Sequence, residues 1–430
     1  MRVLVVGSGG REHAICWKLR QSRLVSDVFC APGNGGISDI ATCVNISVGD
    51  FPRLAQFVEK EQIDYTIVGP EQPLIDGIVD FFEERGLAIF GPNRRAAQVE
   101  GSKAFAKQLM EKYGIPTSAY RSFADYDSAL EYVRQVGAPI VIKADGLAAG
   151  KGVTVAQTLQ EAETALAHIM RDRAFGTAGD EVVVEECLQG EELSLMAFVA
   201  GRSVLPMVVA QDHKPVFDGD KGPNTGGMGA YSPVPHIPEE IVEQAIRDIL
   251  QPMADAMEME GLGFRGVLYA GLMITESGPK VMEFNTRFGD PETQVVLPRL
   301  KSDLLDVLQA TSLAKLDQVT LHWDDRAALC VVLASGGYPG SYETGLPIEG
   351  TIADGTNAIA FHAGTCMKEQ RLVTNGGRVL SVTGMGSDLT EARDEAYSAL
   401  QQINFSNMHY RCDIGDKAIS KILIRDVTLS

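Results

Sequence analysis

The chain has 430 residues, of which 45% are apolar and 22% are charged, and this composition excludes a disordered or fibrous protein. A formal net charge of −19 argues against nucleic-acid binding, which needs a basic surface. No apolar run approaches the roughly 20 residues that cross a bilayer, and the seven cysteines lack the C-x-x-C spacing of zinc sites. We therefore expect no membrane contact and a cytoplasmic protein.

The first hundred residues alternate short β-branched runs with helical stretches. The runs cover residues 2–6, 28–31, 65–68 and 88–90, and a Gly or Pro follows each of them. This rhythm predicts a Rossmann-like parallel α/β domain, which we place at residues 1–102. Ligands of such sheets bind beyond the carboxyl ends of the strands, so we expect the loops at 7–11, 32–36 and 69–71 to share one edge.

The first loop, GSGGREH at residues 7–13, partly matches the dinucleotide-binding fingerprint. Its sixth position is Glu12, where that fingerprint needs glycine, and residues 31–36 lack the acidic residue that holds the ribose of NAD. The sequence therefore disfavours an NAD site. Two interpretations stay open: amides at the helix N-terminus bind a small phosphate ester together with Arg11, or the glycines form a turn without a ligand.

The middle of the chain divides into two units. After a helix at 102–113, Gly114 and Pro116 mark a boundary. The module at about 120–193, which has the size of a mobile lid, has predicted strands at 140–144, 153–156 and 181–185 and a helix that begins at 159. The catalytic body at about 194–325 has predicted strands at 266–274 and 280–284 and a helix at 238–259.

The remaining residues, 326–430, predict a β-rich C-terminal domain. A strand is predicted at 327–334 and a helix at 389–403, and the sequence between them is rich in turns. The whole chain is therefore expected to be a multidomain protein that combines α/β and α+β units.

The segment IVIKADGLAAGKGV at residues 140–153 carries two lysines around a loop of small residues. Such a loop lets backbone amides close on phosphate oxygens, with Lys143 and Lys151 adding charge. It is not a Walker A motif, because Asp145 and Gly152 occupy positions that the motif gives to Gly and to Ser or Thr. The pattern favours phosphate binding over a flexible hairpin with solvated lysines.

Two acidic segments follow. Residues 182–194 form a strand, a turn and a second strand, and this connector could offer main-chain groups to adenine and Glu192 to a ribose, although alone it fits a hairpin with solvated acids better. Along the strand at 281–287, a period of two places Glu283, Asn285 and Arg287 on one face. The two oxygen ligands suit a magnesium ion on nucleotide phosphates, and an edge strand with a polar face is the alternative.

Together these segments resemble the ATP-grasp superfamily, in which a lid lysine, a glycine loop, an E-E-x-L hinge and an E-x-N metal strand occur in this order. Further motifs resemble the phosphoribosylamine–glycine ligase family within it: GSGGREHA at 7–14, GPEQPL at 69–74, QDHK at 211–214, GPNTGGMGA at 222–230 and NTRFGDPE at 285–292. The resemblance covers essentially the whole chain and implies an ATP-grasp region at 103–325.

The resemblance implies a site for ATP and a divalent metal. Contacts with the nucleotide are implied for Lys103, Lys143, Gly146, Gly150, Lys151, Gly152, Val153, Glu185, Glu186, Cys187, Leu188 and Glu192. Glu283 and Asn285 would hold Mg²⁺, or Mn²⁺ in its place. Residues 269–272, YAGL, lack the aspartate that many members of the superfamily carry there, so the number of metal ions stays open.

The same resemblance implies that glycine and 5-phosphoribosylamine are the substrates. Contacts with them are implied for Gly9, Gly10, Arg11, Gly33, Asn34, Glu71, Asp212, Lys214, Thr225, Arg287 and Asp290. Among these, Asp212 and Arg287 would hold glycine, and together with Lys143 they are the candidate catalytic residues.

The implied reaction joins glycine to the amine through glycyl phosphate, in purine synthesis. Alternatives are a ligase for formate or bicarbonate, an idle nucleotide sensor and an NAD oxidoreductase. We expect a monomer whose contact with other purine enzymes is at most transient.

Overall fold

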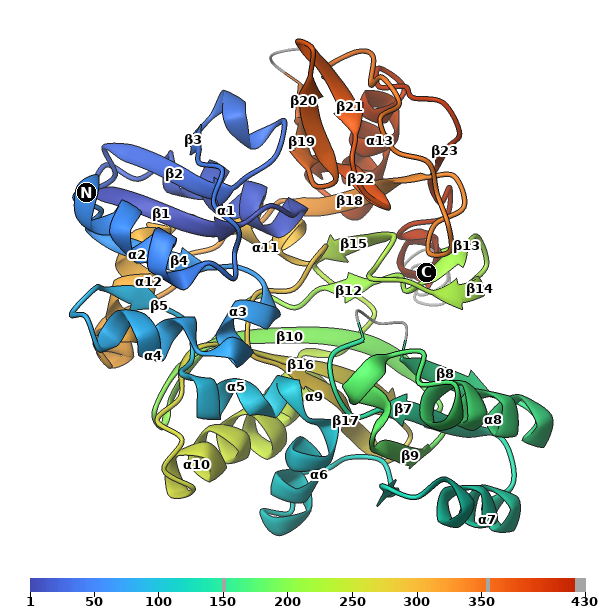
Figure 1. Ribbon diagram of the computed structural model, residues 1–430. Coiled ribbons are helices and arrows are strands. Elements are labelled where there is room, and N and C mark those ends of the chain that lie inside the picture. The colour runs from blue at the N-terminus through green and yellow to red at the C-terminus, as the bar shows by residue number, and fades with distance from the viewer. Residues whose placement is uncertain (149–151, 353–355, 422–430) are drawn as a thin grey trace.

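The computed structural model describes residues 1–148, 152–352 and 356–421. Figure 1 shows an N-terminal sheet in blue, a lid in green, and C-terminal strands in orange and red, placed around a central sheet. This mixed, multidomain α/β architecture confirms the predicted fold class. Within the described residues, no helix is long and apolar enough to span a membrane.

The N-terminal sheet is parallel, as predicted, because each β-branched strand is followed by a helix that crosses over it. Apolar residues cover both faces: Val3 and Val5 belong to one buried cluster, and Leu4 and Val6 to another. The strand order is β3 (Thr42–Cys43), β2 (Asp27–Pro32), β1 (Arg2–Gly7), β4 (Tyr65–Val68), β5 (Ile89–Phe90). The helices are α1 (Gly10–Leu19), α2 (Phe51–Lys60), α3 (Glu71–Asp76), α4 (Ile78–Glu83) and α5 (Arg94–Gly101).

The lid is a small antiparallel sheet backed by two helices. Ser102 caps the preceding helix, α6 (Lys103–Lys112), by accepting a hydrogen bond from the Phe105 amide at 3.0 Å. The strand order is β6 (Tyr120–Phe123), β9 (Val182–Glu186), β7 (Ile140–Ala144), β8 (Val153–Ala156), and the helices are α7 (Tyr126–Val136) and α8 (Leu159–Leu166). The predictions for β7, β8 and the start of α8 are confirmed, whereas β6 and α7 were not predicted.

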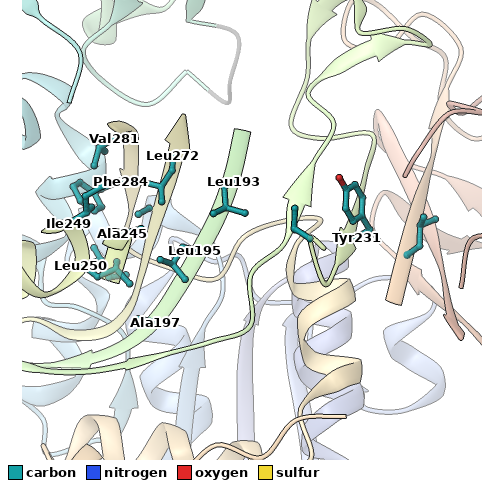
Figure 2. Packing of buried hydrophobic residues seen from close by; sticks show 14 of the residues in the cluster. Leu193, Leu195, Ala197, Tyr231, Ala245, Ile249, Leu250, Leu272, Val281 and Phe284 are labelled. Atoms are coloured by element: carbon teal, nitrogen blue, oxygen red, sulfur yellow. The ribbon is translucent and has the colours of Figure 1, made fainter. Parts of the chain in front are cut away.

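The central sheet is antiparallel and buries one face under a helical layer. On strand β10 (Glu191–Ala200), Leu193 and Leu195 face that layer, whereas Met196 and Phe198 face the opposite side, as the two-residue period of a strand requires. Figure 2 shows the leucines packed with Ile249. Burial of each large apolar side chain stabilises the folded state by about 1.5–3 kcal/mol. The strand order is β11 (Ser203–Pro206), β10 (Glu191–Ala200), β16 (Arg265–Thr275), β17 (Gly278–Asn285).

The helix predicted at 238–259 is interrupted by a π-helical turn. Its parts are α9 (Glu239–Ala245), the π segment (Ile246–Leu250) and α10 (Gln251–Met259). The wider turn inserts Ile249 and Leu250 into the core beneath the sheet. Two further helices, α11 (Thr293–Arg299) and α12 (Leu304–Ser312), follow the central sheet and pack near α1 of the N-terminal domain.

The C-terminal sheet contains strands from both sides of residue 325, where the sequence predicted a boundary. Its order is β12 (Gln211–Asp212), β15 (Gly229–Ser232), β18 (Ala327–Ser335), β22 (Arg378–Gly386), β19 (Ala358–His362), and β23 (Met408–His409) also pairs with β18. Helix α13 (Leu389–Leu400) covers β22. Two hairpins complete it, β13 (Pro215–Phe217) with β14 (Lys221–Asn224), and β20 (Thr365–Lys368) with β21 (Arg371–Thr374). The segment 211–232 therefore connects the central body to the C-terminal domain.

Candidate active site

A cleft of about 720 Å³ lies where the N-terminal sheet, the lid, the central sheet and the C-terminal sheet meet. This is the size of known nucleotide and cofactor pockets. Most of the residues predicted from the sequence line it: Arg11, Glu71, Lys103, Lys143, Gly152, Val153, Glu185, Glu186, Cys187, Leu188, Glu192, Asp212, Lys214, Thr225, Glu283, Asn285, Arg287 and Asp290. Their individual roles stay predictions.

One end of the cleft holds lysines with fixed carboxylate partners. The ammonium of Lys143, at the end of β7, lies 2.9 Å from a Glu185 oxygen and donates to the Met282 carbonyl at 2.9 Å. The other Glu185 oxygen lies 3.0 Å from the ammonium of Lys107 on α6. Burial lowers the pKa of Lys107 to about 8, against the opposing charge of Glu185. The Glu185 side chain therefore ties the lid sheet to α6.

Lys103 lies at the start of α6 and reaches the loop after β7. Its ammonium donates to the Gly146 carbonyl at 3.1 Å. Burial lowers its pKa, although the charge of Glu283 opposes this effect. Gly146 does not line the cleft, and a Cβ there would lie 2.8 Å from that of Ala178, so glycine is needed for close packing. The predicted contacts at Gly150 and Lys151 lie outside the described residues.

The strand β17 brings Glu283 and Asn285 to the cleft beside the lysines. Burial raises the pKa of Glu283, but the charges of Lys214, Lys143 and Lys103 hold it below its ordinary value, so the group is a carboxylate. One carboxylate and one amide oxygen fit a hard divalent ion that takes its other ligands from phosphates and water. No group of three or more Asp, Glu, His or Cys in the described residues could hold a metal by itself.

Arg287 follows this strand and binds two carboxylates, the buried Glu100 and the half-buried Glu71. Its guanidinium lies 2.9 Å from Glu100 and 3.3 Å from Glu71, and it donates to the Asn285 side chain at 3.1 Å. Burial alone would lower the pKa of Arg287, but Glu100 and Glu71 raise it, so the guanidinium stays charged. Because Glu71 comes from the N-terminal domain, Arg287 connects that domain to the end of β17. A substrate carboxylate at Arg287 would have to exchange with one of these partners.

Asp212, Lys214 and Glu192 form a third charged group. The Lys214 ammonium lies 2.7 Å from Glu192 and 3.1 Å from Asp212. Burial, together with the charge of the nearby Glu292, raises the pKa of Asp212 to about 7, although the attraction of Lys214 opposes this rise. Thr225 donates its hydroxyl to the Lys214 carbonyl at 2.7 Å. The group offers alternating charges, which suits a zwitterion such as an amino acid.

In the first glycine loop, Glu12 fills the space in front of the strands. Its carboxylate accepts from the Gly9 amide at 2.5 Å and from Arg11 at 2.6 Å. A Cβ at Gly69 would lie 2.0 Å from Glu12, so the neighbouring loop also needs glycine. Gly9 and Gly10 begin α1 next to Asp290, and neither lines the cleft.

Gly33 and Asn34 also lie outside the lining of the cleft. The Asn34 side chain donates to the carbonyls of Ser8 and His362, both at 2.8 Å, and accepts from the amides of residues 36 and 37. It therefore joins the N-terminal loops to the C-terminal sheet. A Cβ at Gly33 would lie 2.4 Å from the sulfur of Cys43.

Several residues that line the cleft were not predicted from the sequence as site residues: Glu100, Lys107, Asn224, Glu292, Tyr338 and Arg378. Lys107 follows Lys103 by four residues, a spacing that places both on one face of a helix and could have indicated it. Glu292 ends the NTRFGDPE motif and hydrogen-bonds to Tyr269. Arg378 comes from a distant strand, and no local pattern marks it.

Sequence models of the phosphoribosylglycinamide synthetase N, ATP-grasp (A) and C domains match residues 1–100, 101–293 and 328–417. A curated protein from Halalkalibacterium halodurans, named phosphoribosylamine–glycine ligase, is 56% identical over 428 residues, which is 100% of both chains. The protein of that name from Escherichia coli strain K12 is 51% identical over 98% of this chain and 99% of its own.

Solved structures agree. The crystal structure of phosphoribosylamine–glycine ligase from Thermotoga maritima has a TM-score of 0.84 and 35% identity, and the match covers 96% of this chain and 100% of that one. The biotin carboxylase domain of Hydrogenobacter thermophilus 2-oxoglutarate carboxylase has a TM-score of 0.72 over 95% and 91% of the two chains, and its 14% identity shows a shared fold alone. The resemblance read from the sequence is thus confirmed, and the chain belongs to the phosphoribosylglycinamide synthetase family of ATP-grasp ligases.

Proposed function

We propose that this chain joins glycine to 5-phosphoribosylamine at the expense of ATP, giving glycinamide ribonucleotide, ADP and phosphate in purine synthesis. The observation that carries the proposal is that Lys103 and Lys143, Glu283 and Asn285, and the charged pair of Asp212 and Lys214 all line one cleft. The names of relatives that are 56% and 51% identical over nearly the whole chain support the same reaction.

The nucleotide end of the cleft matches the needs of phosphoryl transfer, in which catalysis is mostly positioning and neutralisation of charge. Lys103 and Lys143 would hold ATP phosphates, and the segment from Glu185 to Leu188 would face adenine. A divalent ion, Mg²⁺ or Mn²⁺, held by Glu283 and Asn285 would neutralise further phosphate charge. We expect ATP to reorganise these contacts, because its phosphate oxygens would replace the Glu185 carboxylate at Lys143 and the Gly146 carbonyl at Lys103.

The substrate end would bind the reacting groups. The glycine ammonium would lie beside Asp212, and the glycine carboxylate would exchange with Glu71 or Glu100 at Arg287. The carboxylate attacks the γ-phosphorus of ATP, ADP leaves, and glycyl phosphate forms. The neutral amine of phosphoribosylamine then attacks the glycyl carbonyl carbon, phosphate leaves, and the amine loses a proton to give the amide. The lid would exclude water, which would otherwise hydrolyse the acyl phosphate.

The phosphate of phosphoribosylamine would lie at the edge of the N-terminal sheet. Gly9 caps α1, and Gly10 and Arg11 begin it; amides at a helix N-terminus favour an anion. The phosphate would have to displace the Asp290 carboxylate, which accepts from the Arg11 amide. Asp290 lies beside these residues, so we assign it to the ribose or amine rather than to the phosphate.

We also propose that the enzyme works as a cytoplasmic monomer with only transient contact with other purine enzymes, because one chain supplies all parts of this cleft. Sedimentation at several protein concentrations tests the monomer.

Oxygen transfer tests the acyl phosphate. With ¹⁸O in the glycine carboxylate, the released phosphate should carry one labelled oxygen, because that oxygen bridges carbon and phosphorus in glycyl phosphate. Unlabelled phosphate would refute this route. Formate and bicarbonate serve as controls for the carboxylate: neither should support release of ADP with phosphoribosylamine present, and a faster release with either would move the assignment to another ligase.

The metal strand has its own test. We expect Glu283→Gln to lower kcat by about 10²-fold or more, because the metal and its phosphates lose a charged ligand. Its thermal midpoint should change little, since the carboxylate lies in a cleft. Glu276→Gln is the matched control, because Glu276 is exposed at the turn of the same β16–β17 hairpin. Equal losses of activity and stability in Glu283→Gln would assign that residue a structural role.

A further inference from the structure

Arg411 is a fully buried arginine far along the sequence from the residues of the cleft, with 0% of its surface exposed. Its guanidinium binds both oxygens of Asp413, at 2.7 and 2.8 Å. It also donates to Asp220 at 2.9 Å and to the Pro215 carbonyl at 3.1 Å. A buried arginine needs such a complete set of acceptors, and here two of the three come from the β13–β14 hairpin.

Other contacts fix the same hairpin to the C-terminal segment. The Cys412 amide donates to Asp218 at 2.8 Å, and the Gly219 amide donates to Asp413 at 2.8 Å. Lys417 forms an ion pair with Asp220. The tip of the hairpin is therefore held by backbone and side-chain groups from one short stretch, residues 411–417.

The base of the hairpin leads directly into the cleft. Pro215 follows Lys214 and pairs with Asn224, which lines the cleft. The Thr225 amide and hydroxyl both donate to the Lys214 carbonyl, at 2.8 and 2.7 Å. Lys214 in turn binds Asp212 and Glu192. An unbroken path of contacts thus runs from Arg411 through Pro215 to the charged group of the cleft.

We propose that Arg411 is a positioning residue, which acts through the β13–β14 hairpin to fix Lys214 and Thr225 for the amino-acid substrate; this inference rests on the proposed function. The bidentate pair with Asp413 fixes the guanidinium, and the bond to the Pro215 carbonyl transmits its position. Loss of either hairpin contact should let the Lys214 ammonium move relative to Asp212. Glycine binding should suffer, whereas the nucleotide end, built on α6, β7 and β17, should not change.

Arg411→Lys keeps the charge but loses the planar fork. Asp220→Asn weakens the contacts of the hairpin with Arg411 and Lys417 and keeps the Arg411–Asp413 pair. In both variants we expect the KM for glycine to rise about tenfold, with the KM for ATP within about twofold of the wild type, because small displacements of a binding group are costly. The matched control is Arg393→Lys: Arg393 binds the same C-terminal segment through Asp416 at 2.9 Å and the Cys412 carbonyl at 3.1 Å.

Hydrogen exchange supplies a readout that does not depend on turnover. The backbone amides of 215–225, Thr225 above all, should exchange faster in both variants than in the control. Faster exchange in a protein whose wild type makes no glycinamide ribonucleotide would keep the Arg411 contact and refute the proposed reaction. Unchanged exchange, or equal rises in the KM values for ATP and glycine, would overturn the inference. If Arg411→Lys does not fold, Asp220→Asn decides by the same criteria.

Discussion

Asp212 is a buried carboxyl group that changes charge near neutral pH, because burial raises its pKa to about 7 despite Lys214. Below that pH the free enzyme holds it protonated, and a neutral carboxyl attracts an ammonium group poorly. We therefore expect the KM for glycine to rise as the pH falls from 8 to 6, by about tenfold per pH unit at the acidic end. Initial rates at saturating ATP measure this dependence.

Asp212→Asn provides the comparison for this prediction. An amide cannot titrate, so the variant should have a high KM for glycine that stays flat over the same pH range. A variant that keeps the slope of the wild type would assign the titration to another group, such as Glu192 or Glu292. Varying ATP instead of glycine is the control, because the proposed function assigns Asp212 to glycine and not to the nucleotide.

At the scale of single residues, the sequence identified groups more readily than their partners. The QDHK motif marked Asp212 and Lys214 through the family resemblance. Their partner Glu192 was assigned to a ribose, whereas the structure has its carboxylate on Lys214. Strand pairing across twenty residues decides that contact, and no local pattern contains it. Arg287 was predicted to hold the substrate glycine, and the sequence did not indicate that Glu71 and Glu100 already bind it.

Among the elements, the connector from β9 to β10 depends on Gly190. A Cβ there would lie 2.0 Å from the Ile274 carbonyl oxygen, and the backbone has a φ of 156°. Gly190→Ala must move the connector away from β16, so we expect a loss of about 1–3 kcal/mol in the free energy of unfolding. The KM for ATP should rise as well, because Cys187 and Leu188 of the connector line the cleft and are proposed to face adenine.

Denaturant titration and steady-state rates measure the two effects of Gly190→Ala. Gly49→Ala is the control, since no heavy atom lies within 4 Å of a Cβ at Gly49, and it should leave both unchanged. A stable Gly190→Ala variant with normal ATP binding would show that the connector can shift freely.

The elements themselves were largely predictable where one period dominated. Strands β4, β7 and β8 are rich in β-branched residues, and each has a Gly or Pro directly next to one of its ends. The predicted limits of these three strands are confirmed. By contrast, β3 and β12 have two residues each and gain their identity only from pairing with neighbours. The π-helical turn at Ile246–Leu250 preserves a helical pattern of apolar residues, so periodicity alone cannot separate it from an α-helix.

For the whole molecule, a buried histidine joins the N-terminal and C-terminal domains. His13 on α1 accepts a hydrogen bond from the His362 amide at 2.8 Å, and burial lowers its pKa to about 3. Between pH 6.5 and 3 the unfolded chain binds a proton there that the fold does not. Stability should therefore fall by about 1.4 kcal/mol per pH unit below pH 6.5 from this residue.

His13→Gln should reduce that slope, because glutamine can accept the same bond and does not titrate. Thermal midpoints from pH 7 to 5 measure it. His168→Gln is the control, since His168 is exposed on the lid. An unchanged slope in His13→Gln would place the acid sensitivity elsewhere, first at His213, whose pKa burial lowers to about 4.

The arrangement of domains was the part that the sequence could not supply, and Arg378 shows why. This arginine of β22 donates to the Gly226 carbonyl at 2.7 Å and to the Asp290 carbonyl at 2.7 Å, and its guanidinium lies 3.5 Å from the Asp290 carboxylate. It lines the cleft together with Arg11 of the N-terminal domain. Only the folded chain brings these four distant segments together, so the C-terminal domain completes this part of the cleft.

Arg378→Met tests this completion. Burial raises the pKa of Asp290, but the charges of Arg378 and Arg11 hold it below its ordinary value. Removal of Arg378 therefore leaves a buried carboxylate without its main opposing charge. We expect kcat/KM for phosphoribosylamine to fall by about 10²-fold, with the KM for ATP within about twofold. Arg371→Met, at an exposed position of the β20–β21 hairpin, should match the wild type. Equal losses for both substrates would mean that Arg378 supports the fold as a whole, and the C-terminal domain would then only cover the cleft.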